Sequence, residues 1–483
     1  MSDAVSMTDD SARPGHEVAL AALSVAGGGP RSPERRIAVV EDSHEAEVRF
    51  ANNTITTNGL RRSRQVSVIS LRDKAAGTAA GSASASGPGG DGLLETIVEL
   101  ARSDADGAAA ATDESQLIAP GDEEAAQPSE PFEDPAAETS LGSLTELIGR
   151  LGEALSRSAG DGRALAGFVH HEIRTTWLAS STGIALRHTQ PAARVELNAR
   201  TTDGTASSWA GAAGEDLATI DLDRLEQRIA EGLSWSHRRF ELPAGRYETV
   251  LPPDAVADLV VMLDAALSGR AAADGRSVFS APGGGTRVGE RLMELDFSLR
   301  GDPRKMGVGC PPFLAAPASG RDVSLFDNGI RIEETSWIEA GSLRRLVNHR
   351  AGARDSGVEP APAVDNVILE LPGAGGALED LVGRVERGLL LTCLWYIREV
   401  DPATLLLTGL TRDGVYLVEG GEVVGAVNNF RFNESPLDVL SRAIEASASE
   451  RALSREWGEW QPRTVMPALR VAEFNMSSVS PAT

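Results

Sequence analysis

The sequence predicts an α+β fold with two domains: an N-terminal α/β domain that combines a mixed sheet with helices, and a predominantly β, barrel-like C-terminal domain. A chain of 483 residues is too long for one ordinary core. Runs with helical periodicity alternate with strand-like runs in the first half. In the second half, apolar runs of strand length recur between Gly- and Pro-containing turns almost to the end, which is typical of a barrel or a large curled sheet.

These patterns divide the chain into three parts. Residues 1–33 are small, polar and acidic, and we expect them to be disordered. The N-terminal α+β domain should occupy residues 34–243, and the C-terminal β-rich domain residues 244–483.

Two insertions are expected inside the N-terminal domain. Residues 75–91 consist largely of Ala, Gly and Ser, a composition that predicts a flexible segment. Residues 103–139 contain eleven Asp or Glu, no Lys or Arg and four prolines, so the second insertion, at about 103–140, should be a disordered, solvated loop. A docking or autoinhibitory role for this acidic segment is the alternative.

Alternation and turn residues predict the strands, and a period near 3.6 predicts the helices. The strands expected in the N-terminal domain are 36–49, 52–59, 65–72, 165–175, 178–188 and 194–201, and its helices are 93–102, 141–157 and 222–233. The strands expected in the C-terminal domain are 247–251, 291–299, 329–335, 367–371, 389–400, 405–410, 414–418, 422–427 and 468–474, with helices from 254 and over 436–446.

Composition excludes several classes of partner. The formal charge of −24 argues against nucleic acid or an anionic membrane. No run approaches the ~18 apolar residues that a membrane span needs, and the segment before the apolar stretch 18–27 is too acidic for a signal sequence. Two cysteines, Cys310 and Cys393, are too few for a disulfide framework or a cysteine-based zinc site. We therefore expect a cytoplasmic protein.

Three segments of the second domain resemble the TldD/PmbA family of metalloprotease-like proteins. They are 246–279, with RYETVLPPDAVADLVVMLDAALSGR, 388–440, with GLLLTCLWYIREVDPATLLLTGL, and 466–478, MPALRVAEFNMSS. Weaker similarity covers 47–71 and 179–200 of the first domain. The order and spacing of these blocks, rather than one motif, carries the resemblance.

In the active branch of that family, a helix carries His-Glu-x-x-x-His, and a later cysteine completes a zinc site. Two imidazoles about one turn apart can share one metal, and the glutamate can activate the bound water. Here the corresponding helix is predicted to start with Asp254 as its cap and to end at Gly269.

The alignment puts Val260, Val261 and Ala265 where His, Glu and His would stand. No histidine occurs from 238 to 348 and no cysteine follows Cys393, so we expect neither a catalytic residue nor a metal site in this chain.

The pattern resembles the PmbA (TldE) side of the family. It implies a zinc-less subunit that forms a heteromer with a TldD-type HExxxH subunit, which would hold the zinc, and that supports proteolytic processing of unstructured polypeptides. Two alternatives stay open. One is a stand-alone peptide-binding or scaffold protein, and the other is a metallopeptidase with a rewired metal site that uses His170, His171 or His188.

Other residues suggest sites, each with a structural alternative. His170-His171-Glu172 lacks the second histidine of either zinc motif, and its segment alternates like a strand, which puts neighbours on opposite faces. Asn428, Asn429, Arg431 and Asn433 are candidate peptide-binding residues that follow a predicted strand pair, although a capped turn leading into the helix at Pro436 is the simpler explanation. Trp457 and Trp460 should pack on the second domain or form a subunit interface.

Overall fold

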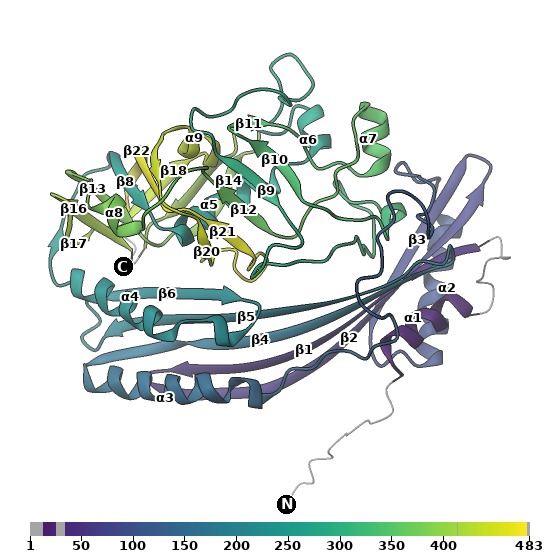
Figure 1. The fold of residues 1–483 in the computed structure, drawn as a ribbon, viewed down its shortest axis with the longest axis horizontal. Coiled ribbons are helices and arrows are strands. Elements are labelled where there is room, and N and C mark those ends of the chain that lie inside the picture. The colour runs from purple at the N-terminus through teal and green to yellow at the C-terminus, as the bar shows by residue number, and fades with distance from the viewer. Residues whose placement is uncertain (1–12, 26–33, 413, 481–483) are drawn as a thin grey trace, which may run out of the picture.

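The computed structural model describes residues 13–25, 34–412 and 414–480, and its first domain is built on one long sheet (Figure 1). Six strands lie in the order β3-β2-β1-β4-β5-β6, and every pair is antiparallel. The expected mixed sheet of this domain is therefore wrong, because hairpin turns rather than helical crossovers join most of these strands. The strands are β1 (Glu34–Ala51), β2 (Thr54–Lys74), β3 (Gly77–Ser86), β4 (Arg163–Ser180), β5 (Ala185–Thr201) and β6 (Ser207–Gly214).

One face of this sheet is apolar and covered by helices. Alternate residues of β1 such as Val40 and Val48 are buried against them, as the period of a half-covered strand requires. The covering helices are α1 (Gly15–Ser24), α2 (Asp91–Gly107), α3 (Thr145–Gly160) and α4 (Leu222–Trp235). Short 3₁₀ turns precede α3 and α4, at η1 (Leu141–Leu144) and η2 (Leu217–Thr219).

Three segments that we expected to be disordered contain ordered structure. Within the expected disordered segment 1–33, residues 15–24 form α1, while 1–12 and 26–33 lie outside the described residues. The expected flexible insertion 75–91 contains β3, which pairs with β2 along its length. A Cβ at Gly81 would lie 2.2 Å from the backbone nitrogen of Ala105, so β3 packs directly on α2.

The acidic insertion at 103–140 is also ordered in this structure. Its first residues continue α2, and the rest runs against the first sheet and the second domain. Arg187 pairs with Glu130, and Arg350 donates to Glu124 at 3.1 Å. Arginines that are distant in sequence thus pair with acidic residues of this segment, which has no Lys or Arg of its own.

The second domain contains two further sheets. A six-stranded sheet has the order β11-β10-β9-β12-β21-β20, and a ten-stranded sheet runs from β14 to β7 with β19 attached to β22. Both sheets mix parallel and antiparallel pairs. The described strands form open sheets, so the barrel-like closure that we expected is corrected, while the β-rich character is confirmed.

The strands of this domain are β7 (Arg239–Phe240), β8 (Gly245–Leu251), β9 (Ser298–Gly301), β10 (Thr335–Glu339), β11 (Ser342–Leu343), β12 (Val367–Glu370), β13 (Arg387–Leu391), β14 (Trp395–Asp401), β15 (Leu406–Leu410), β16 (Val415–Glu419), β17 (Glu422–Val427), β18 (Phe430–Glu434), β19 (Ala443–Ala446), β20 (Glu450–Ala452), β21 (Thr464–Met466) and β22 (Leu469–Val479). Its helices are α5 (Pro253–Ala265), α6 (Gly269–Ala273), α7 (Arg350–Ser356), α8 (Leu378–Val382) and α9 (Pro436–Ser441), with the 3₁₀ turn η3 (Leu325–Asp327). In the part of the chain that the structure describes, no helix combines the length and hydropathy that crossing a membrane requires.

Candidate functional site

Helix α5 is the element on which the zinc motif of the active relatives would stand, and it lies in the core of the second domain. It starts at Pro253, a residue whose fixed φ suits a first turn. Asp254, expected to cap the helix, lies inside it and makes a different contact. Its Oδ1 accepts a hydrogen bond from the Leu453 amide at 2.9 Å, and its Oδ2 accepts one from Arg228 of α4 at 2.5 Å. Asp254 therefore joins the two domains.

Asp258 lies one turn further along α5 and holds the loop that follows β20. Its Oδ1 accepts hydrogen bonds from the Ser454 hydroxyl at 2.7 Å and from the Glu456 amide at 2.8 Å. Trp457 donates its indole N–H to the Asp258 carbonyl at 3.0 Å. Burial raises the pKa of the Asp258 carboxyl to about 8, although the two hydrogen bonds act in the opposite direction. The protonated, neutral acid is thus the form that the fold stabilises at neutral pH.

The three positions aligned with the zinc motif occupy different environments on α5. Val260 is buried in the core, Val261 is half-buried and Ala265 is exposed. Aliphatic side chains offer no ligand to a divalent cation, so these residues do not fit a zinc site. Among the described residues, no group of three or more His, Cys, Asp or Glu is arranged to hold a metal.

A different acid occupies the end of α5. Asp264 is half-buried, and burial together with the nearby Asp365 raises the pKa of its carboxyl to about 7. Asp365 precedes β12 and pairs with Arg463, which precedes the neighbouring parallel strand β21. Burial also raises the pKa of the Cys310 thiol to about 12, which leaves it inert as a nucleophile. The one signal for Asp258 and Asp264 in the sequence is the presence of acids within an otherwise apolar helix.

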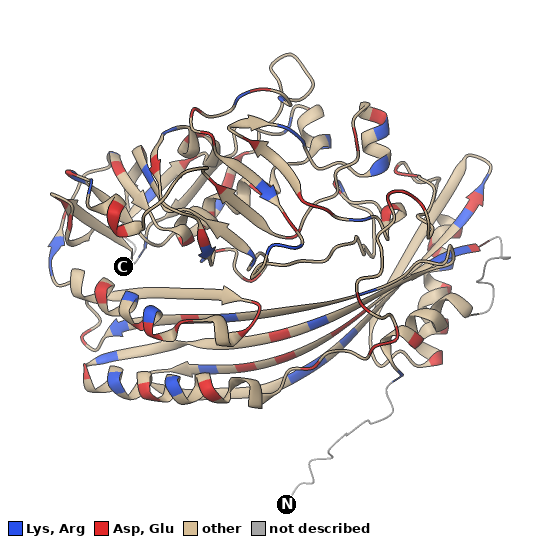
Figure 2. Cartoon of the chain, viewed as in Figure 1, with Lys and Arg blue, Asp and Glu red and all other residues tan. Residues whose placement is uncertain are grey.

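The face of the first sheet that lies toward the second domain is apolar near Ile37 and Leu71, which cluster with Phe326, and polar further along the strands. Cross-strand register places Glu47 of β1, His170 of β4 and Arg194 of β5 side by side on this face. His170 Nε2 lies 3.7 Å from Glu45 Oε2, and Arg174 donates to Glu172 at 2.9 Å. Figure 2 shows both signs of charge along these long strands. Paired charges of this kind give a wet surface rather than an apolar core.

Several contacts connect that face to the second domain. Gln190 Nε2 donates to the Gly309 carbonyl at 3.1 Å, and the ring of His188 lies 6.5 Å from that of Phe313, edge to face. The Arg455 guanidinium lies 3.4 Å from Glu196 and covers the ring of Trp209. The contacts of Arg455 hold the loop after β20, which Asp258 of α5 also bonds, beside β5 and β6.

The histidines of the expected rewired site do not converge. Alternation along β4 is confirmed, and it puts His170 and His171 on opposite faces. The buried His171 Nδ1 bonds the Thr139 hydroxyl at 2.6 Å, while His188 bonds Gln190 at 3.1 Å. Burial lowers the pKa of both His171 and His188, so both rings are neutral at pH 7.

The four candidate peptide-binding residues lie in and before β18. Asn428 accepts a hydrogen bond from the Leu242 amide at 2.7 Å, the Asn429 carbonyl accepts one from Ser480 at 2.8 Å, and Arg431 donates to Thr408 at 3.3 Å. Because β15 and β22 pair with both edges of β18, a peptide could reach the side chains here but not the main chain. Peptide binding by these residues stays a prediction.

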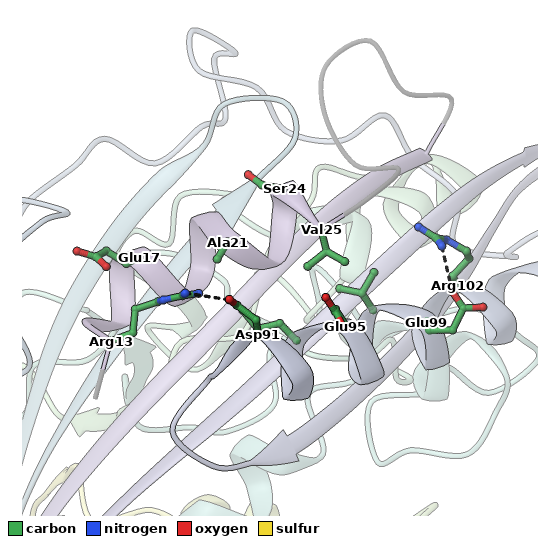
Figure 3. A pocket seen from close by; sticks show the side chains of 11 residues that line it. Arg13, Glu17, Ala21, Ser24, Val25, Asp91, Glu95, Glu99 and Arg102 are labelled. Carbon is green, nitrogen blue, oxygen red and sulfur yellow. Dashed lines mark hydrogen bonds and ion pairs between the residues drawn. The ribbon is translucent and has the colours of Figure 1, made fainter. Parts of the chain in front are cut away.

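Two polar pockets lie elsewhere on the surface. Asn433 lines one of about 660 Å³, beside the ion pair of Glu434 with Arg442. The other, about 770 Å³, lies between α1 and α2, where Arg13 pairs with Asp91 at 2.8 Å and Arg102 pairs with Glu99 at 3.0 Å (Figure 3). The pairs between α1 and α2 resemble ordinary solvated surface, whereas Glu434 is buried and burial raises the pKa of its carboxyl.

Residues 244–478 match the family model described as the PmbA/TldA metallopeptidase C-terminal domain. This C-terminal region of the chain belongs to the TldD/PmbA family. No curated protein sequence matches it.

Solved structures share the fold over nearly the whole chain. TldE from Thermococcus kodakarensis is similar with a TM-score of 0.73 at 18% identity, covering 92% of this chain and 96% of that one. A protein from Thermotoga maritima described as a candidate modulator of a DNA gyrase has a TM-score of 0.73 at 17% identity, covering 95% and 99%. A Bacteroides thetaiotaomicron protein with the same description has a TM-score of 0.73 at 14% identity, covering 96% and 98%.

Proposed function

We propose that this chain is the non-catalytic, zinc-less subunit of a TldD/PmbA-type metalloprotease. In this proposal it forms a heteromer with a TldD-type subunit that carries the HExxxH helix, and it supports cleavage of unstructured polypeptides. The proposal rests on one observation. Aliphatic side chains of α5, those of Val260, Val261 and Ala265, stand at the positions aligned with the zinc motif. The likeness of the fold to a protein named TldE supports it.

The anchoring of α5 explains how such a subunit keeps its shape without a metal. Asp254 and Asp258 tie the helix to α4 and to the loop after β20, so hydrogen bonds do the positioning that ligation would do in an active subunit. The zinc, the activated water and the acid–base chemistry would belong to the partner. Cys310 and Cys393 are both buried and form no disulfide with each other, which suits a reducing compartment, and we place the heteromer in the cytoplasm.

Co-expression tests this proposal. The chain should co-purify with the relative from the same genome that carries the HExxxH helix, and the pair should cleave unfolded casein. Metal analysis should find about one zinc per heteromer and none in this chain purified alone. The matched control replaces the motif glutamate of the partner with glutamine, which should abolish cleavage while the subunits stay together.

Two results would contradict the proposal. One is a tightly bound metal that supports peptide cleavage by this chain alone, which would favour the rewired peptidase. The other is the absence of any HExxxH relative from the genome, which would favour a stand-alone peptide-binding or scaffold protein.

A further inference from the structure

Strand β2 has a free edge over the first half of its length. It pairs with β1 from Thr54 onward, but β3 pairs only with the part that starts at Gln65. No described strand or bridge pairs with the other edge of residues 54–63. All ten of these residues are exposed. An edge of this length is an open template for another strand.

The hydrogen-bond pattern shows which main-chain groups point outward. The Arg64 carbonyl accepts a hydrogen bond from the Gly87 amide at 3.1 Å, so Arg64 faces the β3 side of β2. Residues alternate between the two edges of an antiparallel strand. Arg62, Leu60 and Asn58 therefore direct their N–H and C=O groups to the free side, while the residues between them bond β1.

The side chains of this edge combine β-forming, apolar and basic residues. Ile55 is 40% and Leu60 is 52% exposed, and the segment 54–57 is Thr-Ile-Thr-Thr. Residues 52–64 contain Arg61, Arg62 and Arg64 and no acid, in a chain whose net charge is −24. Arg62 and Arg64 pair with Glu138 and Asp42, whereas no described residue forms an ion pair with Arg61.

Neither a close contact within the described residues nor the backbone conformation explains why residue 59 is a glycine. A Cβ there would meet nothing within 4 Å, and its φ is not in the left-handed region. A glycine within a strand often marks the close approach of another backbone. In this structure the approaching chain would come from outside.

We propose that an acidic β-strand of the partner subunit adds to the free edge of β2 at residues 54–63 and extends the first sheet across the heteromer. Arg61, with which no described residue forms an ion pair, favours a strand with carboxylates, whereas a second copy of this chain would bring a second Arg61. A subunit would cover the edge permanently, together with the exposed Ile55 and Leu60, whereas a transient substrate would leave the edge bare between encounters. This inference rests on the proposed function, because it assigns the surface used by that partner.

Proline at outward-facing positions tests the inference. The double variant Asn58→Pro/Leu60→Pro removes two N–H groups from the free edge and leaves the hydrogen bonds to β1 in place. The matched control, Asn58→Ala/Leu60→Ala, keeps both N–H groups. We expect the affinity for the co-expressed HExxxH relative to fall at least tenfold for the proline pair and no more than threefold for the alanine pair. Arg61→Glu/Arg62→Glu should also weaken binding, by about tenfold.

Hydrogen exchange on the unaltered proteins gives a second readout that does not depend on how the variants fold. The amides of Asn58, Leu60 and Arg62 should exchange at least tenfold more slowly in the heteromer than in the free chain. Unchanged exchange together with tight binding of the partner overturns the inference and leaves the proposed function standing. Failure of the wild-type chain to bind the relative overturns both.

Finding either of two other occupants at the free edge of β2 would also overturn the inference. A homodimer of the wild-type chain that the proline pair abolishes would show that a second copy occupies the edge. A need to delete residues 1–12 before the relative binds would show that the chain occupies the edge itself.

Discussion

The guanidinium carbon of Arg455 lies 3.8 Å from the ring centroid of Trp395, and the same side chain covers Trp209 at 5.2 Å. Trp209 belongs to β6 of the first sheet, while Trp395 opens β14 of the second domain. Arg455 also lies 3.4 Å from Glu196 of β5. One cation thus joins two aromatic rings and a carboxylate from both domains.

Replacing this cation should loosen the domains. Arg455→Ala should lower the free energy of unfolding by about 2 kcal/mol, because a stacked, paired guanidinium is lost. Arg455→Lys should recover only part of that loss, since an ammonium cannot stack on a ring plane. Thermal unfolding followed by tryptophan fluorescence measures both. A lysine variant as stable as the wild type would show that charge alone matters here.

The buried Asp258 carboxyl should make stability depend on pH. Its pKa is about 8 in the folded protein and 3.8 ordinarily, so between these values the unfolded chain releases a proton that the folded chain keeps. Stability should therefore fall as pH rises across this window, by at least about 1 kcal/mol between pH 5 and pH 8, and level off above it. Urea unfolding at several pH values measures the slope.

Asp258→Asn is the control for this pH dependence. The amide keeps an oxygen for Ser454 and Glu456 and cannot ionise. The variant should lose the part of the slope that Asp258 causes, and it should gain stability relative to the wild type at pH 8. An unchanged slope would assign the pH dependence to other groups.

The packing of β3 on α2 can be tested with two glycines. Gly81→Ala should destabilise the protein by about 2 kcal/mol or more, because the new methyl group would meet the backbone of Ala101 and Ala105. Gly92→Ala, within α2, meets nothing within 4 Å and should stabilise by about 0.5–1 kcal/mol. Chemical denaturation gives both values. Equal effects of the two substitutions would mean that β3 is not held against α2.

Arg350 should keep the acidic segment folded against the second domain. Its guanidinium donates to Asp327 at 2.7 Å, to Glu124 at 3.1 Å and to the Gln116 carbonyl at 2.6 Å. Arg350→Ala should raise the rate of proteolysis between residues 108 and 126 by about tenfold, through local unfolding. Arg344, whose half-exposed side chain pairs with Glu339 at 3.1 Å, is the control, and Arg344→Ala should change that rate by less than about twofold. Protection of the segment in the Arg350 variant would contradict this role.

Residue spacing predicted the elements of the fold that depend on residues close together in the sequence. The alternation of His170 and His171, the helix at 141–157 and the helical character of α5 were all readable from residue spacing. The ordered β3 was missed because small residues suggest flexibility, although here their size allows close contact with α2.

The interactions between distant residues could not be predicted. The acidic segment is fixed by Arg187 and Arg350, which lie far away in the sequence, and Asp258 is buried by a loop almost 200 residues later. Asp254 was expected to cap α5 because an acid near a helix start usually does so. Its bond to Leu453 depends on a tertiary contact that no local window contains.

The carboxylates that anchor α5 have a consequence for engineering. Asp258 and Val260 are about 200° apart around the helix axis, so the anchored side and the side of Val260 are nearly opposite. A new side chain at position 260 would leave those hydrogen bonds in place, but it would have to fit the core in which Val260 is buried. The helix offers a frame for grafting metal ligands, since the hydrogen bonds of Asp254 and Asp258 hold it in place.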